Sequence, residues 1–193
     1  GKFSKCSSIL IVTNGAFGLD KLKAKEYIEK LLEIARHREG YPLKIRICIS
    51  TDNFHQEGAP VQAVKNIIDI IMELEKKSHG SFPIEVFLAT LLGFDQPVFE
   101  LAKAYSTDYK PLKPDEKGVT KLMIDTQRKV DVQYYRFMDK SARSKRVIDE
   151  VPEDLISHDR FPIEGISQYK IGGAGNKLDI RIFEDGQIVA GRE

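Results

Sequence analysis

Residues 43–57, LKIRICISTDNFHQE, decide how the rest of the sequence is interpreted. The first eight alternate between apolar and other side chains, which is typical of a β-strand with one buried face. The apolar set is Leu43, Ile45, Ile47 and Ile49, and the other set is Lys44, Arg46, Cys48 and Ser50. Segment 50–57 brings together hydroxyl, carboxylate and imidazole groups, which is more polar chemistry than a plain turn requires. This segment is therefore either a solvated loop or the rim of a site.

Strands and helices alternate on both sides of this segment. Residues 8–13 (SILIVT) and 83–90 (PIEVFLAT) are apolar runs typical of strands in a parallel sheet. Helical spacing and terminal residues predict three helices, over about 20–40, 60–80 and 96–105. Strands that alternate with helices in this way pair in parallel, so the sequence predicts an α/β fold.

The pattern is less regular in the second half. Residues 108–118 are polar and contain two prolines, which is typical of a loop. Residues 130–138 predict a fourth strand, and residues 178–190 predict a β-hairpin that turns at Asp185 and Gly186. We expect a single domain over 1–193, with regular βα units over 8–105, a loop or insert over 106–129, and the last sheet strand with a C-terminal β-hairpin over 130–193.

Composition and charge narrow the class of protein. With 193 residues, 41% hydrophobic and 31% charged, the chain is typical of one globular domain. The net charge of +1 gives no bulk charge signal for nucleic acid. The longest apolar runs are too short to cross a bilayer and no signal peptide opens the chain, so we expect a cytoplasmic protein with no membrane partner. Cys6 and Cys48 alone are too few for a structural zinc site or an iron–sulfur cluster.

Polar residues lie at or after the predicted carboxyl ends of the strands, where parallel α/β folds place their chemistry. The candidates are Asn14, Ser50, Asp52, His55, Glu57, Thr90 and, after the fourth strand, Arg143. Three of them have a structural alternative: Asn14 fits a turn, Asp52 fits a turn that bonds its own backbone, and His55 fits the surface. Arg46 fits an edge strand in water, or an inward-facing position that favours a polar ligand. Their shared location favours a site.

The order of these segments resembles the middle and C-terminal part of a radical S-adenosylmethionine (radical SAM) domain. The pieces that carry the resemblance are the Thr13-Asn14-Gly15 turn, then residues 46–55 (RICISTDNFH), then the helix from Pro60 to Ile68. Weaker pieces are residues 135–143 (YRFMDKSAR) and the closing hairpin. The similarity covers residues 9–190.

The resemblance implies a parallel-stranded partial (β/α) barrel and two cofactors, S-adenosylmethionine (SAM) and a [4Fe–4S] cluster. In that family, reductive cleavage of SAM yields a 5′-deoxyadenosyl radical that abstracts hydrogen from a substrate, which is unknown here. The resemblance places Asn14, Arg46, Ser50 and Asp52 at the cofactor, and His55, Glu57, Thr90 and Arg143 on the substrate side. It assigns no catalytic residue and no metal ligand.

The C-x-x-x-C-x-x-C motif that holds the cluster is absent, as is the family's "GGEP"-like motif. The chain is therefore expected to be inactive by itself. Either a missing N-terminal segment or a partner chain supplies the cluster and covers the open barrel edge, or the chain is a relative that lost the cluster. Two other functions remain open. One is a non-catalytic domain that binds SAM or a nucleotide-like ligand, and the other is a hydrolase that uses His55 and Glu57. Metal binding by Asp52, His55 and Glu57 has no recognised spacing.

Overall fold

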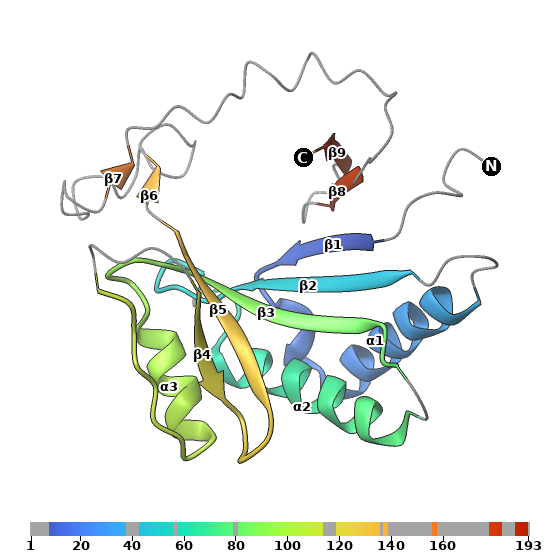
Figure 1. Cartoon of the computed structure of the whole chain (residues 1–193), viewed down its shortest axis with the longest axis horizontal. Coiled ribbons are helices and arrows are strands. Elements are labelled where there is room, and N and C mark those ends of the chain that lie inside the picture. Colours follow the sequence, from blue (N-terminus) through green and yellow to red (C-terminus); the bar gives the residue numbers. More distant parts are fainter. Residues whose placement is uncertain are drawn as a thin grey trace.

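The computed structural model describes residues 8–37, 43–55, 58–78, 81–113 and 119–135, and the backbone of the strands at 137–138, 156–157, 178–182 and 188–192. It confirms the α/β fold. The main sheet has five strands in the order β1-β2-β3-β5-β4 (Figure 1). Their bounds are Ser8–Thr13 for β1, Lys44–Ser50 for β2, Ile84–Leu91 for β3, Val119–Met123 for β4 and Lys129–Tyr135 for β5.

Local sequence signals explain where the helices begin. The short helix η1 (Ala16–Leu19) precedes α1 (Lys21–Arg36), and the Asp20 carboxylate caps α1 by accepting from the N–H groups of Leu22 and Lys23. Helix α2 (Val61–Lys77) begins after Pro60, and α3 (Gln96–Ala104) has a proline in its first turn. Among the described helices, none is both long enough and apolar enough to cross a membrane.

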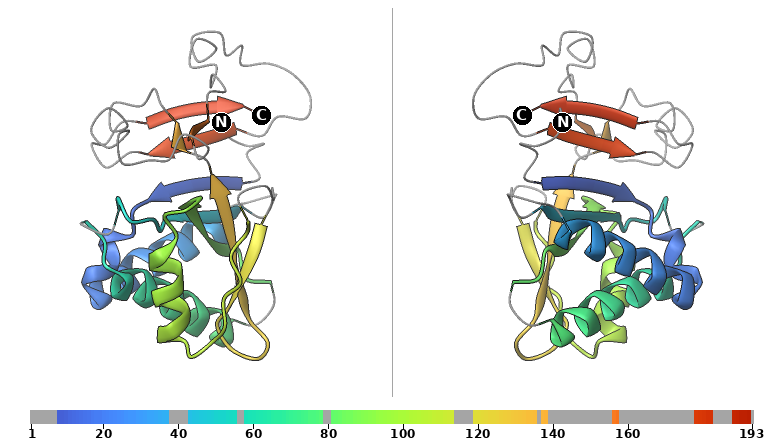
Figure 2. Two further views of the ribbon diagram at one scale, coloured as in Figure 1. Left: turned by 90° about the vertical axis from the view of Figure 1, so that its left-hand side faces the viewer. Right: turned by 90° about the vertical axis from the view of Figure 1, so that its right-hand side faces the viewer.

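The three α-helices of the described residues lie on the same face of the sheet (Figures 1 and 2). The core lies between them and the strands, because alternate strand residues point toward the helices. Its buried members include Ala24 and Ile28 of α1, Ile45, Ile47 and Ile49 of β2, Ile67, Ile68 and Ile71 of α2, Val86 and Leu88 of β3, Val98 and Leu101 of α3, and Val130 and Val132 of β5.

The parallel strands follow one another in space as they do along the chain. β1, β2, β3 and β5 are neighbours in that order and each pair is parallel. Since the helices between them stay on one face, the sheet is wound in one direction only, unlike a doubly wound sheet with helices on both faces. It is an open sheet with β1 and β4 at its edges, and no closed barrel forms in the described part of the chain.

The structure corrects part of the expectation for residues 106–129. Residues 119–123 form β4, which pairs antiparallel with β5, whereas the sequence predicted a loop or insert. The sequence signal was weak because Leu122 is the one buried residue of β4 and the turn after it contains no glycine. The predicted strand over 130–138 is divided, since β5 ends at Tyr135 and β6 (Phe137–Met138) pairs instead with β7 (Ile156–Ser157).

The C-terminal hairpin is confirmed. β8 (Leu178–Ile182) and β9 (Ile188–Arg192) pair antiparallel, and the predicted turn between them lies outside the described residues. In both figures this hairpin lies beside β1, on the side of the sheet away from the helices (Figure 2). It forms a sheet of its own rather than extending the main sheet.

Candidate functional site

The segment that leaves β2 is held firmly at its first two residues. The Thr51 N–H donates to the Ala89 carbonyl (2.7 Å), and the Thr51 hydroxyl donates to the Ile49 carbonyl (2.9 Å). Both Thr51 and Asp52 are buried, with residue exposures of 1% and 3%. The segment therefore begins inside the protein, at the carboxyl end of the sheet, rather than as a solvated loop.

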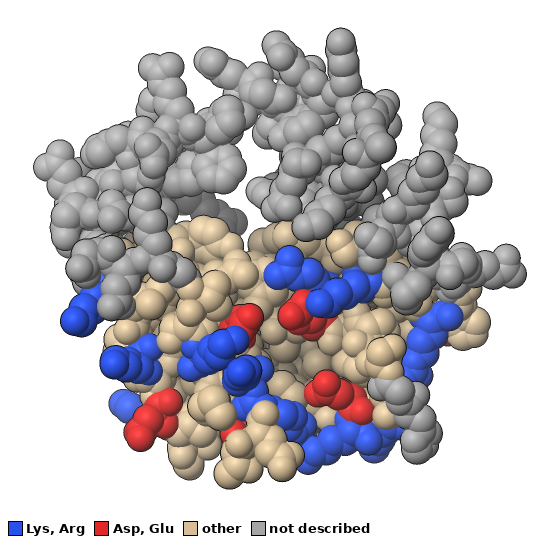
Figure 3. Space-filling view, viewed as in Figure 1, with Lys and Arg blue, Asp and Glu red and all other residues tan. Residues whose placement is uncertain are grey.

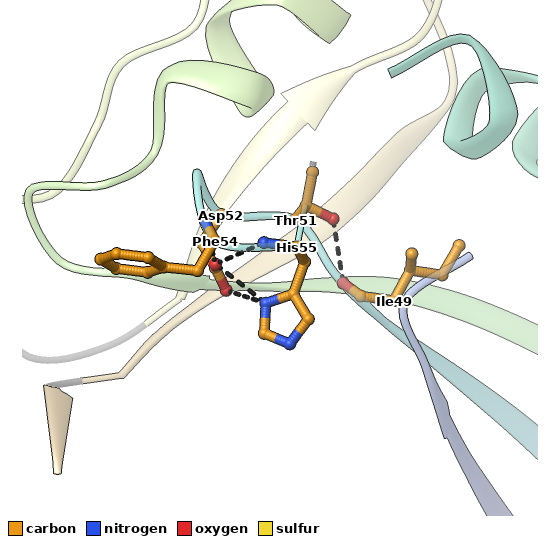
Figure 4. A network of polar contacts seen from close by, with 5 residues as sticks. All are labelled: Ile49, Thr51, Asp52, Phe54 and His55. Carbon is orange, nitrogen blue, oxygen red and sulfur yellow. Dashed lines mark hydrogen bonds and ion pairs between the residues drawn. The ribbon is translucent and has the colours of Figure 1, made fainter. Parts of the chain in front are cut away.

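Asp52 is bonded to two residues that follow it (Figure 4). Its Oδ1 accepts from the backbone N–H of Phe54 (3.0 Å) and of His55 (3.3 Å). Both carboxylate oxygens lie 2.8 Å from His55 Nδ1. An ionised carboxylate accepts hydrogen bonds and donates none, so this contact is the one expected of a neutral ring that carries its proton on Nδ1 and not on Nε2.

These contacts bear on the alternatives that the sequence left open. Asp52 does satisfy the backbone of its own turn, as one alternative expected, and it also orients an imidazole ring. His55 is neither fully exposed nor buried, with 29% of its side chain accessible. Neither fact tests a role in ligand binding, so the roles assigned to Asp52 and His55 stay predictions.

Asn14 lies in a tight turn next to this loop. Its Oδ1 accepts from the Ala16 N–H (2.9 Å), and Gly15 adopts a left-handed conformation at φ 85°. A Cβ on Gly58 would lie 3.1 Å from Asn14 Nδ2, so the ends of β1 and of the loop after β2 are adjacent. The alternative of a turn is confirmed for Asn14, whose amide Nδ2 faces the loop.

Arg46 lies on the face of the sheet that the helices leave open. β2 lies between β1 and β3, so the alternative that Arg46 sits on an edge strand is wrong. Its Nε lies 3.3 Å from Glu85 Oε2 on β3, and its guanidinium carbon lies 4.9 Å from the centre of the Phe87 ring. Its side chain is 40% exposed. Ser50 follows on the same face of β2, nearer the carboxyl end, by the alternation of the strand.

Of the remaining candidates, the structure describes only Thr90, which lies apart from this group. Thr90 is 1% exposed, and the alternation of β3 places it on the helix-covered face with Val86 and Leu88. Its hydroxyl is buried without a hydrogen-bond partner in the described part of the chain. Glu57 and Arg143 lie outside the described residues.

A polar network that sequence reasoning missed lies at the same end of the sheet. Tyr134, at the end of β5, donates its hydroxyl to Asp95 Oδ2 (2.6 Å), and its oxygen is also hydrogen-bonded to the Tyr109 hydroxyl. Burial raises the pKa of both phenols well above the ordinary value. Phe54, Phe94 and Tyr134 all pack against Leu92, and the ring centres of Phe54 and Phe94 lie 4.9 Å apart. No sequence signal links these residues, because they are far apart along the chain.

Two further properties bear on the class of ligand: how charges are distributed on one face, and whether possible metal ligands are grouped. On the face shown in Figure 3, acidic side chains lie among the basic ones rather than apart from them. Across the described ranges, no three His, Cys, Asp or Glu side chains are grouped so that they could hold a metal ion. A [4Fe–4S] cluster needs three or four thiolates and the whole chain has two cysteines, so its residues do not fit that cofactor.

In the comparisons with known proteins, no family model matches this chain and no curated protein matches it in sequence.

Proposed function

We propose that the chain is the middle and C-terminal part of a radical SAM-type domain and that it binds SAM on the helix-free side of the sheet. The observation that supports this most directly is the one-sided arrangement, in which β1, β2, β3 and β5 follow in order with all of the described α-helices on one face. A (β/α) barrel has the same arrangement, with helices outside and the other strand face inside. This arrangement supports a partial barrel whose interior face carries Arg46 and Ser50.

The chemistry of that face supports an amino acid ligand. The guanidinium of Arg46 contacts Glu85 through Nε, its side chain is 40% exposed, and it also carries two Nη atoms. Those atoms form the fork that binds a carboxylate with two parallel hydrogen bonds. SAM carries such a carboxylate, and also a ribose whose hydroxyls suit Ser50 and the Asn14 amide at the carboxyl end. Asp52 suits this role less, because its oxygens already bond Phe54 and His55.

The proposal does not extend to radical formation by this chain. Its two cysteines do not fit the cluster, so reductive cleavage of SAM and hydrogen abstraction from the unknown substrate belong to a protein that also contains a cluster-binding part. A cytoplasmic location is part of the same proposal.

Titration calorimetry of the chain with SAM and with S-adenosylhomocysteine tests the binding proposal. We expect both to bind and Arg46→Gln to weaken binding about tenfold or more, because a lost hydrogen bond between charged groups costs about 1.5–3 kcal/mol. The matched control is Arg36→Gln on α1, since Arg36 is also exposed and bonds only to the Ser78 hydroxyl (2.7 Å) among the described residues. Absence of binding, or equal affinities of the two variants, contradicts the proposal.

A second candidate is a non-catalytic domain that binds SAM or a nucleotide-like ligand, and the lack of cluster ligands favours it. Iron content separates the two. A longer form of the protein with three closely spaced cysteines, purified without oxygen, is expected to be brown and to contain iron if the radical SAM proposal holds. A colourless longer form that still binds SAM favours the non-catalytic domain.

A further inference from the structure

The Asp52–His55 pair has a feature that the turn does not explain. The turn after β2 uses Oδ1, which accepts from the backbone N–H groups of Phe54 and His55. Oδ2 bonds only to the His55 ring among the described residues. Keeping a carboxylate 4% exposed is costly unless it is paired, and an Asn at this position would cap the same turn without a charge. The carboxylate is therefore explained by the imidazole it holds.

The ring is held in one orientation, with its other nitrogen free to act. Nδ1 faces both carboxylate oxygens at 2.8 Å, while Nε2 lies on the opposite side of the ring, pointing away from Asp52 (Figure 4). Within the part of the chain that the structure describes, no residue bonds to Nε2, and 29% of the side chain is accessible. An imidazole with its tautomer set by a buried carboxylate is the arrangement that makes histidine an effective proton acceptor.

We propose that Asp52 and His55 form a proton-accepting site at the carboxyl end of β2, which acts on a hydroxyl, water or amine group of a bound ligand. His55 Nε2 takes the proton: the O–H or N–H bond of the ligand breaks, its electron pair stays on the ligand atom, and an N–H bond forms at Nε2. The positive charge that develops on the ring faces the Asp52 carboxylate, which stabilises it. Asp52 acts through His55 and is a positioning residue. The site does not depend on SAM, so failure of the proposed function would not contradict it, and its own failure would not contradict the proposed function.

The tautomer of the His55 ring tests the positioning role directly. Long-range proton–nitrogen NMR spectra of the full chain at about pH 8, where an ordinary imidazole is neutral, report which ring nitrogen carries the proton. We expect the proton on Nδ1 in the native chain. In Asp52→Asn the amide can still cap the turn through its oxygen, while its NH₂ group faces Nδ1, so we expect the proton to move to Nε2. A ring with the same tautomer in both proteins overturns the positioning role.

The reactivity of Nε2 tests proton acceptance, with 4-nitrophenyl acetate as the probe and water as the proton donor. Water oxygen bonds to the acyl carbon, the ester C–O bond breaks, 4-nitrophenolate leaves, and the proton of the water passes to Nε2. We expect His55→Gln to lower the rate of nitrophenolate release by the full chain at least about tenfold, since a positioned general base contributes 10²–10⁴-fold. Asp52→Asn is expected to lower it severalfold, because the wrong tautomer has no free lone pair at Nε2.

The control is His37→Gln. His37 ends α1 and its Nδ1 lies 3.0 Å from the Glu33 carbonyl, so its ring is also bonded but has no carboxylate partner in the described structure. We expect this variant to keep the native rate. Equal rates for His37→Gln and His55→Gln overturn the proposal, as does a folded Asp52→Asn protein, judged by circular dichroism, with the native rate.

Discussion

At the residue scale, two adjacent tyrosines of β5 have opposite environments. Tyr134 faces the helix side and is hydrogen-bonded to both Asp95 and Tyr109. Tyr135 faces the other side, is 50% exposed, and donates its hydroxyl to Gln133 Oε1 two residues earlier (2.7 Å). Comparing substitutions of these two tyrosines therefore measures how much the hydrogen-bond network contributes to stability.

Tyr134→Phe is expected to lower the free energy of unfolding by about 1–3 kcal/mol, because the Asp95 carboxylate and the Tyr109 hydroxyl both lose a partner in a partly buried setting. Tyr135→Phe is expected to change it by less than about 0.5 kcal/mol, as is usual for surface positions. Urea unfolding curves of the two variants measure the difference. Equal losses for the two variants would show that the network adds no more to stability than the contacts of the Tyr135 hydroxyl do.

At the scale of elements, β4 and β5 are joined by a turn that centres on Asp125. The Asp125 carboxylate accepts from the backbone N–H of Gln127 (2.9 Å) and of Arg128 (2.8 Å), and from the Arg128 guanidinium, whose Nε lies 2.8 Å away. The backbone bond from Gln127 is the largest cause, followed by the Arg128 side chain, and together they lower the pKa of Asp125 to about 2. The turn is thus built around the ionised carboxylate.

The stability of this hairpin is expected to depend on acid pH. Because the folded pKa of about 2 lies below the ordinary value of 3.8, the contribution of Asp125 is complete above about pH 4 and is lost as the pH falls toward 2. The difference in unfolding free energy between the native chain and Asp125→Asn should therefore shrink across that interval. Urea titrations of both proteins between pH 6 and pH 2 measure it. A difference that is constant with pH would mean that the ionised form is not favoured by folding.

At the scale of the whole molecule, the strands of the sheet differ in whether they are paired on both sides or on one side. β2 and β3 are paired on both sides, whereas β1 and β4 are paired on one side in the described sheet. All six residues of β1 are half-buried, and an apolar edge of this kind can pair with a further strand.

The rates of amide hydrogen exchange are expected to depend on whether a strand is paired on both sides or on one side. The amides of β2 and β3 should exchange slowest, and those amides of β1 that point away from β2 should exchange at least about tenfold faster. NMR-detected exchange of the chain in D₂O measures the rates. Uniform slow exchange along β1 would show that another strand pairs with its outer edge.

Much of the fold could be predicted from local sequence, and some of the site could not. The alternation in residues 43–50 and the apolar runs of β1 and β3 are visible without a structure, because burial on one face leaves a period of two. β4 was missed because one buried residue leaves too little pattern. The Asp52–His55 bond joins residues three apart, so the sequence could single out both residues, but the bond itself depends on the conformation of the loop.

The sequence by itself determined the strands β1 to β3, the helices between them and the polar residues that follow β2. Only the tertiary structure decided that the described α-helices lie on one face, that Arg46 of β2 meets Glu85 of the adjacent strand β3, and that Tyr134, Asp95 and Tyr109 share one network. The physical reason is that hydrophobic burial is non-directional. A local pattern therefore shows which side of a strand is buried, but the residue that each side chain contacts depends on strand order and packing.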